Sequence, residues 1–330
     1  MARVTTIDFP IELPVVRRGD AWIARAGDIE LRLSNLDKVY WPDEGFTKGD
    51  LVTYYFNISP VMLPHITHRP LTLKRMPDGV TGDFFYEKNA PTYTPEWMPT
   101  IPVHSQREGR TINYQTVENV AHMLWLANLG CIEFHPLHAR GPKQSHPDYA
   151  FFDLDPMGNA TWENVQEVAG LVKVILDRFD IACYPKTSGA TGMQIYIPLA
   201  RKQTYDEVRG FVGTVSDVVH EAAPDITTVE WEVRKRESKV FLDVNMNREG
   251  ANIAAAYSVR PEPGGTVSMP FTWEELDDVH PSRFTMASVW DRVVEDDPFL
   301  PVAQDEGYDL AEPIKALDAQ PRKARDIRAR

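Results

Sequence analysis

The sequence is poor in the features that mark secreted, membrane-bound and disulfide-rich proteins. Its 330 residues include only two cysteines, Cys131 and Cys183, which cannot form a disulfide framework and which favour a reducing compartment. No apolar run approaches the ~18 residues of a membrane span, and the N-terminus lacks the continuous apolar segment of a secretory signal. These absences predict a cytoplasmic globular protein with no membrane partner.

Glycine-rich nucleotide-binding signatures and an excess of positive charge are also missing. The sequence contains neither GxxxxGK[ST] nor GxGxxG, so it matches neither a P-loop nor a dinucleotide-binding fold. With 35 Lys+Arg against 48 Asp+Glu, its formal net charge is -13, which would repel nucleic acid if it were spread evenly. The charge is uneven, however, because residues 271–312 carry -10 and residues 314–330 carry +4. Local contacts with nucleic acid therefore remain open.

Hydrophobic periodicity predicts helices interspersed with short paired strands. The expected helices span residues 116–129, 162–179 and 205–222. The expected strands include residues 131–135, 150–154, 181–186 and 193–198. A charged turn, RKRES, is predicted to close a hairpin between residues 229–233 and 240–244. This mixture favours an α+β (mixed α/β) fold.

The most informative stretch is YAFFDLDPMG, in which an apolar strand runs into Asp153 and Asp155. Residues two apart on a strand point to the same side, so the two carboxylates repel each other unless a cation lies between them. Asp243 ends a second apolar strand, KVFLDVN. Three acids at strand ends can hold two hard divalent metal ions. The alternative is that these aspartates belong to ordinary structural turns.

A second informative segment is KTSGATGMQ, residues 186–194, which combines two glycines with three hydroxyl side chains between two expected strands. The exposed backbone N–H groups of such a turn can form a nest that binds an anion. A plain hairpin turn would have the same composition, so both interpretations stand at this point.

Ten segments of the chain, taken together, resemble a known family. In order, they are LSNLDKVYWP, TKGDLVTYY, PVMLPHI, RPLTLKRMPDGV, FFYEKNAP, IEFHP, FFDLDP, TSGATGMQIYIPL, KVFLDVNMN and YSVRP. The chain resembles the polymerase domain of the bacterial end-joining ligase (ligase D), within the archaeo-eukaryotic primase superfamily, from about Leu31 to Glu312. This resemblance implies a primase-polymerase core of two packed β-sheets flanked by helices. It implies one domain over residues 1–300, with a DNA- and 5′-phosphate-binding part (1–147) and a catalytic part (148–300), followed by a C-terminal tail (301–330).

The same resemblance implies roles for individual residues. Two catalytic metal ions, Mn²⁺ or Mg²⁺, would be bound by Asp153, Asp155 and Asp243. The incoming nucleotide or its phosphates would be contacted by Lys74, His135, Ser188, Thr191, Gln194 and Arg260. A 5′-phosphate across a gap would be held by Asn35, Lys38 and Lys48. The template strand and nearby DNA would be contacted by Arg75, Phe84, Phe85 and Arg236.

Several of these assignments are less direct than the others. The family usually has Lys and His where this chain has Thr191 and Gln194. Because charge-assisted hydrogen bonds are roughly twice as strong as neutral ones, we expect weaker or altered nucleotide contacts. Phe84 and Phe85 could instead be ordinary core residues. Lys38 and Lys48 can share a pocket only if the intervening turn folds them together.

The resemblance implies a DNA-templated, divalent-metal-dependent nucleotidyltransferase that extends primers and fills short gaps at DNA breaks, with ribonucleotides among its substrates. Its partners would be gapped or broken DNA with a 5′-phosphate, NTPs or dNTPs, and an end-binding protein, which implies association with the nucleoid. The sequence shows no ligase motif, so we expect a stand-alone polymerase that acts with a separate DNA ligase. The alternatives are a non-catalytic DNA-end or 5′-phosphate-binding module that recruits repair partners, and a two-metal nuclease.

Overall fold

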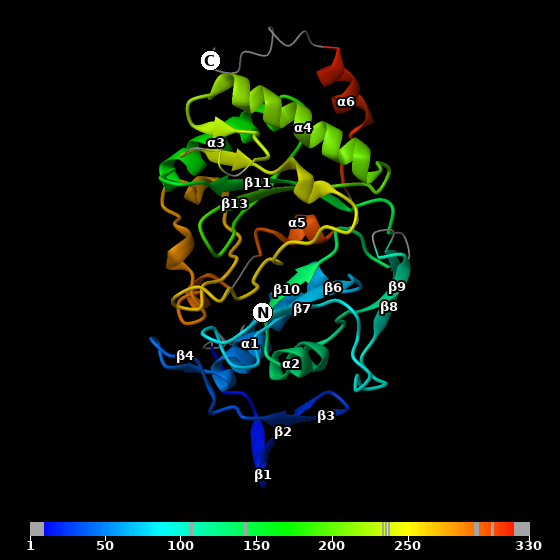
Figure 1. The fold of residues 1–330 in the computed structure, drawn as a ribbon, viewed down its shortest axis with the longest axis vertical. Coiled ribbons are helices and arrows are strands. Elements are labelled where there is room, and N and C mark those ends of the chain that lie inside the picture. The colour runs from blue at the N-terminus through cyan, green and yellow to red at the C-terminus, as the bar shows by residue number, and fades with distance from the viewer. Residues whose placement is uncertain are drawn as a thin grey trace, which may run out of the picture.

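The structure, a computed structural model, describes residues 10–105, 108–141, 144–232, 234, 236, 238–293, 297–304 and 307–319. Two five-stranded sheets lie one above the other in Figure 1, with helices on their outer sides. A small sheet of β1 (Val15–Arg18), β2 (Ala21–Ala26) and β3 (Ile29–Ser34) projects below them. This arrangement confirms the expected α+β (mixed α/β) fold with two packed sheets flanked by helices.

The N-terminal sheet has the strand order β10-β6-β9-β8, with β7 paired to β6. Its strands are β6 (Leu71–Arg75), β7 (Phe85–Glu87), β8 (Thr100–Ser105), β9 (Arg110–Gln115) and β10 (Cys131–Pro136). Helices α1 (Lys48–Ile66) and α2 (Val120–Asn128) pack on each other below this sheet (Figure 1). A hairpin of β4 (Val39–Trp41) and β5 (Phe46–Thr47) leads into α1. Thr47 and Asp50 form a reciprocal capping box at the start of α1, which satisfies free backbone N–H groups there.

The C-terminal sheet has the order β12-β13-β11-β15-β14. Its strands are β11 (Tyr149–Pro156), β12 (Tyr184–Thr187), β13 (Met193–Pro198), β14 (Thr227–Thr228) and β15 (Val240–Leu242). Helices α3 (Trp162–Asp177) and α4 (Tyr205–Ala222) cover its outer face (Figure 1). The predicted helices 162–179 and 205–222 are confirmed. The helix predicted over 116–129 begins later, at Val120, because Asn119 caps it by accepting from the N–H of His122.

The predicted hairpin between residues 229–233 and 240–244 is wrong. Strand β15 pairs in parallel with β14 and antiparallel with β11. Residues 229–232 lie in no strand, and residue 233 lies outside the described residues. The physical reason is burial: β15 is almost completely buried, whereas Val229 and Trp231 are exposed. Strand β15 therefore pairs inside the sheet, where both of its faces are covered, and not across the charged turn.

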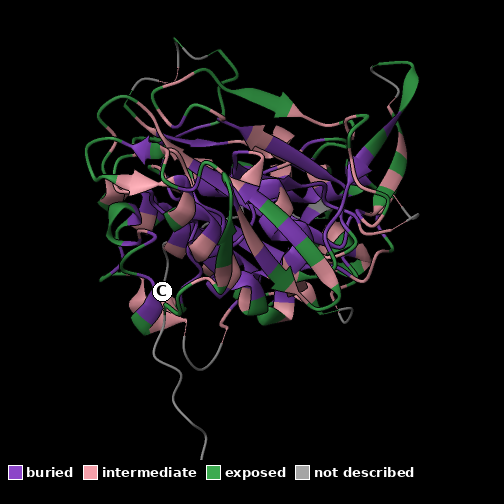
Figure 2. Cartoon of the chain, turned by 90° about the horizontal axis from the view of Figure 1, so that it is seen from below, coloured by how far each residue is buried: buried purple, intermediate pink, exposed green. Residues whose placement is uncertain are grey.

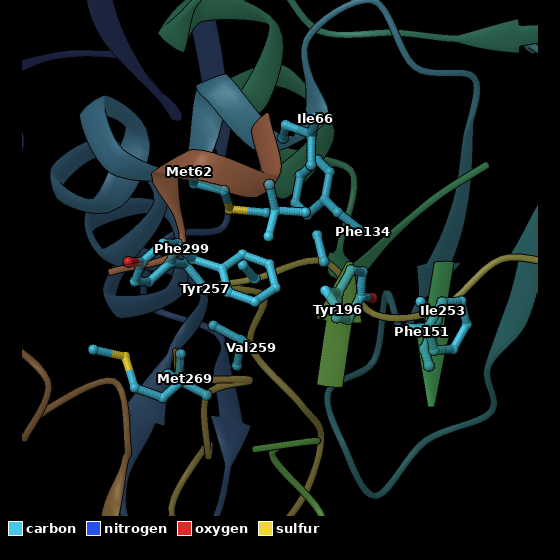
Figure 3. Close-up of a cluster of buried hydrophobic side chains, with 14 of the residues drawn as sticks. Met62, Ile66, Phe134, Phe151, Tyr196, Ile253, Tyr257, Val259, Met269 and Phe299 are labelled. Carbon is cyan, nitrogen blue, oxygen red and sulfur yellow. The ribbon is translucent and has the colours of Figure 1, made fainter. Parts of the chain in front are cut away.

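Residues 251–270 join the two sheets. The Ala255 N–H donates to the Phe134 carbonyl on β10 over 2.9 Å, and the Thr187 N–H on β12 donates to the Met269 carbonyl over 2.9 Å. The two sheets and α1 thus share one hydrophobic core. Figure 3 shows part of it, with Met62 and Ile66 of α1, Phe134 and Tyr196 from the two sheets, and Tyr257 from the joining segment. Figure 2 shows that buried residues fill the centre of the molecule and exposed ones its periphery.

The described residues after 299 also pack on this core. They form α5 (Leu300–Ala303) and α6 (Ala311–Asp318). Leu310 is fully buried, and the Tyr308 N–H donates to the Pro198 carbonyl at the end of β13. Residues 320–330 of the predicted tail lie outside the described residues. Among the helices that the structure describes, none is both long and apolar enough to cross a membrane.

A buried ion pair ties the segment before β6 to the segment before β11. The Arg69 side chain is 1% exposed, and its Nη1 lies 2.7 Å from Asp148 Oδ1. Arg140 and Arg201 also approach Asp148. Burial raises the pKa of Asp148, but these arginines, Arg69 above all, outweigh it and hold the pKa below the usual 3.8. Removal of the carboxylate would leave a buried guanidinium without its counter-charge.

We expect Asp148→Asn to lower the free energy of unfolding at pH 7 by ~3–5 kcal/mol, the usual effect of removing one partner of a buried pair. Because the folded pKa lies below the unfolded one, the carboxylate stabilises the fold above about pH 4 and loses this effect as the pH falls further. Urea unfolding at several pH values measures both effects. Asp177→Asn, which breaks an exposed pair with Lys173 on α3, is the control and should cost only ~0.5 kcal/mol. Equal losses for the two variants would contradict the prediction.

Candidate active site

Three aspartates converge at the ends of two neighbouring strands. Asp153 and Asp155 lie two residues apart on β11, and Asp243 follows β15 directly. Leu154 pairs with Leu242, and the Asp243 N–H donates to the Asp153 carbonyl over 3.1 Å. The register of the two strands therefore brings the third aspartate beside the first two, as the sequence predicts.

The three carboxylates repel one another in a poorly solvated place. Burial and then the charge of Asp155 raise the pKa of Asp153 well above its usual value. Burial and then the charge of Asp243 raise the pKa of Asp155, and burial raises the pKa of Asp243. A cation would relieve this repulsion, and an all-oxygen donor set suits Mg²⁺ or Mn²⁺.

The three carboxylates do not form a metal site by themselves. Within the described residues, no group of three or more His, Cys, Asp or Glu side chains is arranged so that it could hold a metal ion alone. Mg²⁺ usually takes only one or two protein carboxylates and completes its shell with water and substrate phosphates. Asp153, Asp155 and Asp243 supply oxygen donors of the right chemistry, and water or substrate oxygens would have to complete the shells of the metal ions that the sequence predicts.

Two buried polar side chains, linked by hydrogen bonds, support Asp153. Gln194 Nε2 donates to Asp153 Oδ1 over 2.8 Å, and Lys186 Nζ donates to Gln194 Oε1 over 2.8 Å. The Gln194 side chain is buried, so its amide is committed to the carboxylate and to the lysine. Its direct contact with a nucleotide therefore stays a prediction, and its observed place is that of a support for Asp153.

Lys186, which the sequence does not single out, is the second of these side chains and donates to Gln194. Its side chain is 0% exposed, and Nζ also donates to the Ala254 carbonyl and the Ser268 hydroxyl. Burial and then the charge of Arg260 lower the pKa of Lys186 to about 7. A lysine beside a predicted glycine turn was the only available signal, and lysines in such places are usually exposed.

The turn between β12 and β13 lies against the strand that carries the aspartates. Ser188 Oγ accepts from the N–H groups of Ala190 and Gly192, over 3.1 and 3.0 Å. A Cβ atom added to Gly192 would lie 2.4 Å from the Leu154 carbonyl, so only glycine permits this close approach. Thr191 is exposed at the turn. The segment is thus a hairpin turn in which Ser188 already binds two of the N–H groups, and its contact with an anion stays a prediction.

Three predicted nucleotide contacts meet at one carboxylate that the sequence does not single out, Glu133 on β10. Its Oε1 lies 2.8 Å from Lys74 Nζ, and its Oε2 lies 2.6 Å from His135 Nε2 and 3.3 Å from Arg260 Nε. The Arg260 contact is an ion pair without hydrogen-bond geometry, because Nε has no hydrogen-bond partner. Arg260 Nη1 donates to the Ser188 carbonyl over 2.6 Å, which connects this cluster to the turn.

The charge of Glu133 is fixed by its neighbours. Burial raises its pKa, but the hydrogen bonds from His135 and Lys74 and the charge of Arg260 outweigh burial and lower the pKa to about 2. Burial lowers the pKa of His135. Because an ionised carboxylate can only accept hydrogen bonds, His135 Nε2 must carry the proton of their shared bond. The available signal was a glutamate inside the apolar segment IEFHP, since a buried acid needs partners.

The three residues predicted to hold a 5′-phosphate are brought together by the β4–β5 hairpin. The Lys48 N–H donates to the Lys38 carbonyl, and the Lys38 N–H donates to the Asn35 carbonyl, over 2.8 and 3.1 Å. Burial and then the charge of Lys38 lower the pKa of Lys48 to about 8. Lys48 Nζ donates to the Ser34 carbonyl, and Lys38 Nζ lies 2.5 Å from Asp78 Oδ1. The turn therefore brings the charges of Lys38 and Lys48 close enough to interact, while Asp78 offsets the charge of Lys38. Their contact with a 5′-phosphate stays a prediction.

The two predicted template-stacking residues are not core residues. Phe84 and Phe85 are 54% and 46% exposed. Lys74 Nζ lies 4.9 Å from the centre of the Phe84 ring, and the Arg75 guanidinium lies 5.2 Å from the centre of the Phe85 ring. Arg75 also pairs with Glu87 over 2.7 Å, so it is held beside the Phe85 ring. Its direct contact with DNA stays a prediction.

Arg236 lies close to the carboxylates. Its guanidinium lies 3.5 Å from the centre of the Phe241 ring, and it donates to the Glu230 and Trp231 carbonyls. Its charge opposes the rise in the pKa of Asp155. The structure therefore places Arg236 at the border of the carboxylate cluster, and the predicted contact with DNA is not tested by this geometry.

Comparisons with known proteins point to one family. A family model of the LigD primase-polymerase domain matches residues 47–299. The bifunctional non-homologous end joining protein LigD of Bacillus subtilis (strain 168) is 32% identical over 266 residues, which cover 80% of this chain and 42% of that protein. The multifunctional LigD of Mycolicibacterium smegmatis is 32% identical over 267 residues, which cover 80% of this chain and 35% of that protein.

A solved structure extends the comparison to the fold. The polymerase domain from Mycobacterium tuberculosis ligase D, in complex with DNA, matches with a TM-score of 0.77 and 30% identity, covering 83% of this chain and 98% of that one. The chain spans less than half the length of the two curated LigD relatives described above. The similarity therefore concerns less than half of each of those two proteins.

Proposed function

The chain belongs to the LigD primase-polymerase family, and from this premise we propose that it is a divalent-metal-dependent nucleotidyltransferase of DNA repair. It extends primers on a DNA template and fills short gaps at breaks that carry a 5′-phosphate. Its substrates are NTPs and dNTPs, and it acts with a DNA ligase activity and an end-binding protein. The names of the relatives, which refer to non-homologous end joining, support this setting.

The observation that carries the proposal is the proximity of Arg260, from a cationic cluster, to Asp155 of the carboxylate cluster. Asp153, Asp155 and Asp243 gather negative charge on β11 and β15, while Lys74 and Arg260 gather positive charge around Glu133. Arg260 is near enough to Asp155 to oppose the rise in its pKa. Phosphoryl transfer depends mainly on positioning and on stabilisation of the charge of the transferred group. A site with acids for metal ions beside cations for a triphosphate meets this need.

Each part of the site has a role in this scheme. Asp153, Asp155 and Asp243 would hold Mn²⁺ or Mg²⁺ ions, which supply charge stabilisation and lower the pKa of an attacking hydroxyl when bound. Gln194 orients one oxygen of Asp153. Lys74 and Arg260, both partly accessible, bind the triphosphate.

The DNA contacts lie outside this centre. Phe84 and Phe85 offer a stacking surface that accepts any base, worth ~1–3 kcal/mol for each base that stacks. Lys38 and Lys48 form a basic locus for the 5′-phosphate on the far side of a gap. Both surfaces are local, so the acidic remainder of the chain does not need to touch DNA.

The proposal is tested by primer extension on a gapped duplex with a 5′-phosphate, with NTPs and dNTPs compared in Mn²⁺ and Mg²⁺. Asp155→Asn, alone and with Asp153→Asn, should reduce the rate by more than the ~10–100-fold typical of changes outside the metal shell. Asp217→Asn removes the same charge from an exposed position on α4. This matched control should extend primers at the parent rate.

The outcomes of this assay separate the alternatives. A double variant that extends primers as fast as the parent would refute the assignment of the carboxylates. Shortened primers would indicate a two-metal nuclease. Binding of the gapped duplex without turnover by the parent chain would indicate a non-catalytic end-binding module.

The 5′-phosphate locus makes a separate prediction. Lys38→Ala, alone and with Lys48→Met, should remove most of the advantage of a 5′-phosphate over a 5′-hydroxyl in gap filling, since each charge-assisted contact contributes ~1.5–3 kcal/mol. Extension of an open primer-template should stay near the parent rate. Lys202→Ala, at an exposed site beside Asp309, is the control. Equal losses on gapped and open substrates would contradict the assignment.

A further inference from the structure

Glu133 is the anion on which the candidate triphosphate site is assembled. Its side chain is 1% exposed, whereas those of Lys74, His135 and Arg260 are 15%, 10% and 20% exposed. The Glu133 carboxylate is thus more deeply buried than the side chains of its three partners. None of the roles derived so far uses this carboxylate.

The three partners come from separate parts of the chain. Lys74 is on β6 and faces Glu133 directly across the strand pair, His135 follows two residues later on β10, and Arg260 comes from the segment that joins the sheets. Residues two apart on a strand share a face, so Glu133 and His135 both point away from Phe134, which packs on Tyr55 of α1. Glu133 pairs with all three of these side chains.

The two carboxylate oxygens divide the partners between them. Oε1 receives Lys74, while Oε2 receives His135 and lies beside Arg260. The Arg260 guanidinium is fixed a second time by the Ser188 carbonyl, so the arginine connects Glu133 to the glycine turn. Lys74 Nζ has the Phe84 ring as its other neighbour. The position of the lysine therefore depends mainly on Glu133.

We propose that Glu133 is a positioning residue that holds Lys74, His135 and Arg260 in the arrangement that binds a nucleoside triphosphate. This inference rests on the proposed function and adds a residue to it. One carboxylate offsets part of the repulsion between the two permanent cations but leaves the group net positive, as an anionic ligand requires. Without it, Lys74 and Arg260 repel each other and turn towards solvent, and the triphosphate must pay for their ordering when it binds.

The test is steady-state gap filling by the full chain with Glu133→Gln and Glu133→Asp. Glu133→Gln should raise the KM for the nucleotide by ~10–100-fold, as removal of a buried partner of a binding group does, with a smaller change in kcat. Glu133→Asp, which keeps the charge, should recover part of the loss. Glu275→Gln, which breaks an ion pair with Arg292 elsewhere in the chain, is the matched control and should leave KM unchanged.

A paired variant keeps the test decisive if Glu133→Gln alone folds poorly. Lys74→Met combined with Glu133→Gln removes both charges of the Lys74–Glu133 pair, which is often nearly neutral for stability. If Glu133 acts through Lys74, Glu133→Gln should raise KM by a much smaller factor in the Lys74→Met background than in the parent. Equal factors in both backgrounds would overturn the positioning of Lys74 by Glu133, and an unchanged KM in Glu133→Gln would overturn the whole proposal. A lower KM would also overturn it, because it would show that the carboxylate competes with the triphosphate.

Direct binding separates this proposal from the proposed function. Equilibrium binding of radiolabelled ATP to the parent chain on a gapped duplex with a chain-terminated primer requires no turnover. If the parent binds ATP but never extends a primer, the proposed function fails while the role of Glu133 can still be read from the binding constants. Binding of ATP that is equal in the parent and in Glu133→Gln would overturn the positioning role, whatever the activity of the parent.

Discussion

Repulsion between carboxylates at the meeting point of β11 and β15 is the constraint on which the site depends. The strand register fixes Asp153, Asp155 and Asp243 next to one another, and burial raises the pKa of each. The surrounding structure limits this repulsion without removing it. Gln194 donates to Asp153, and the charges of Arg236 and Arg260 act on Asp155. What remains is a local excess of negative charge that divalent cations would neutralise.

The cationic half of the site has the opposite arrangement of charge. There the permanent charges are positive, and a single buried carboxylate, Glu133, holds them in place. Arg260 connects the two halves, because it lies beside Glu133, donates to the Ser188 carbonyl and opposes the rise in the pKa of Asp155 through its charge. Lys74 and Arg260 would offset the charge of a triphosphate, and divalent cations would offset the charge of Asp153, Asp155 and Asp243. The net charge of -13 is compatible with this scheme because the attraction is local.

The sequence predicts the parts of the fold and site that depend on local pattern. The bounds of α4 agree with the expected 205–222 because apolar periodicity and the Thr204 capping box both act within the helix. The convergence of the aspartates also follows from strand alternation and from two apolar runs that end in acids. The roles of the individual residues came from the family resemblance and not from the pattern.

What the sequence could not supply depends on distant partners. The partners of Glu133 are separated from one another by up to 186 positions, between residues 74 and 260, and no local pattern records that they meet. The burial of Lys186 is likewise set by residues 254 and 268, which the chain brings to it from the joining segment. The hairpin after residue 229 failed for a related reason, because β15 has the composition of a strand but its partners lie elsewhere in the sheet.

The central claim is that Asp153, Asp155 and Asp243 together bind divalent cations, and binding of Mn²⁺ tests it without any need for turnover. Electron paramagnetic resonance of free Mn²⁺ gives the number and affinity of bound ions in the parent chain, with and without ATP. The account predicts that Asp155→Asn weakens this binding while Asp217→Asn leaves it at the parent value. Equal Mn²⁺ affinity in all three proteins would contradict the claim that these carboxylates form the metal site.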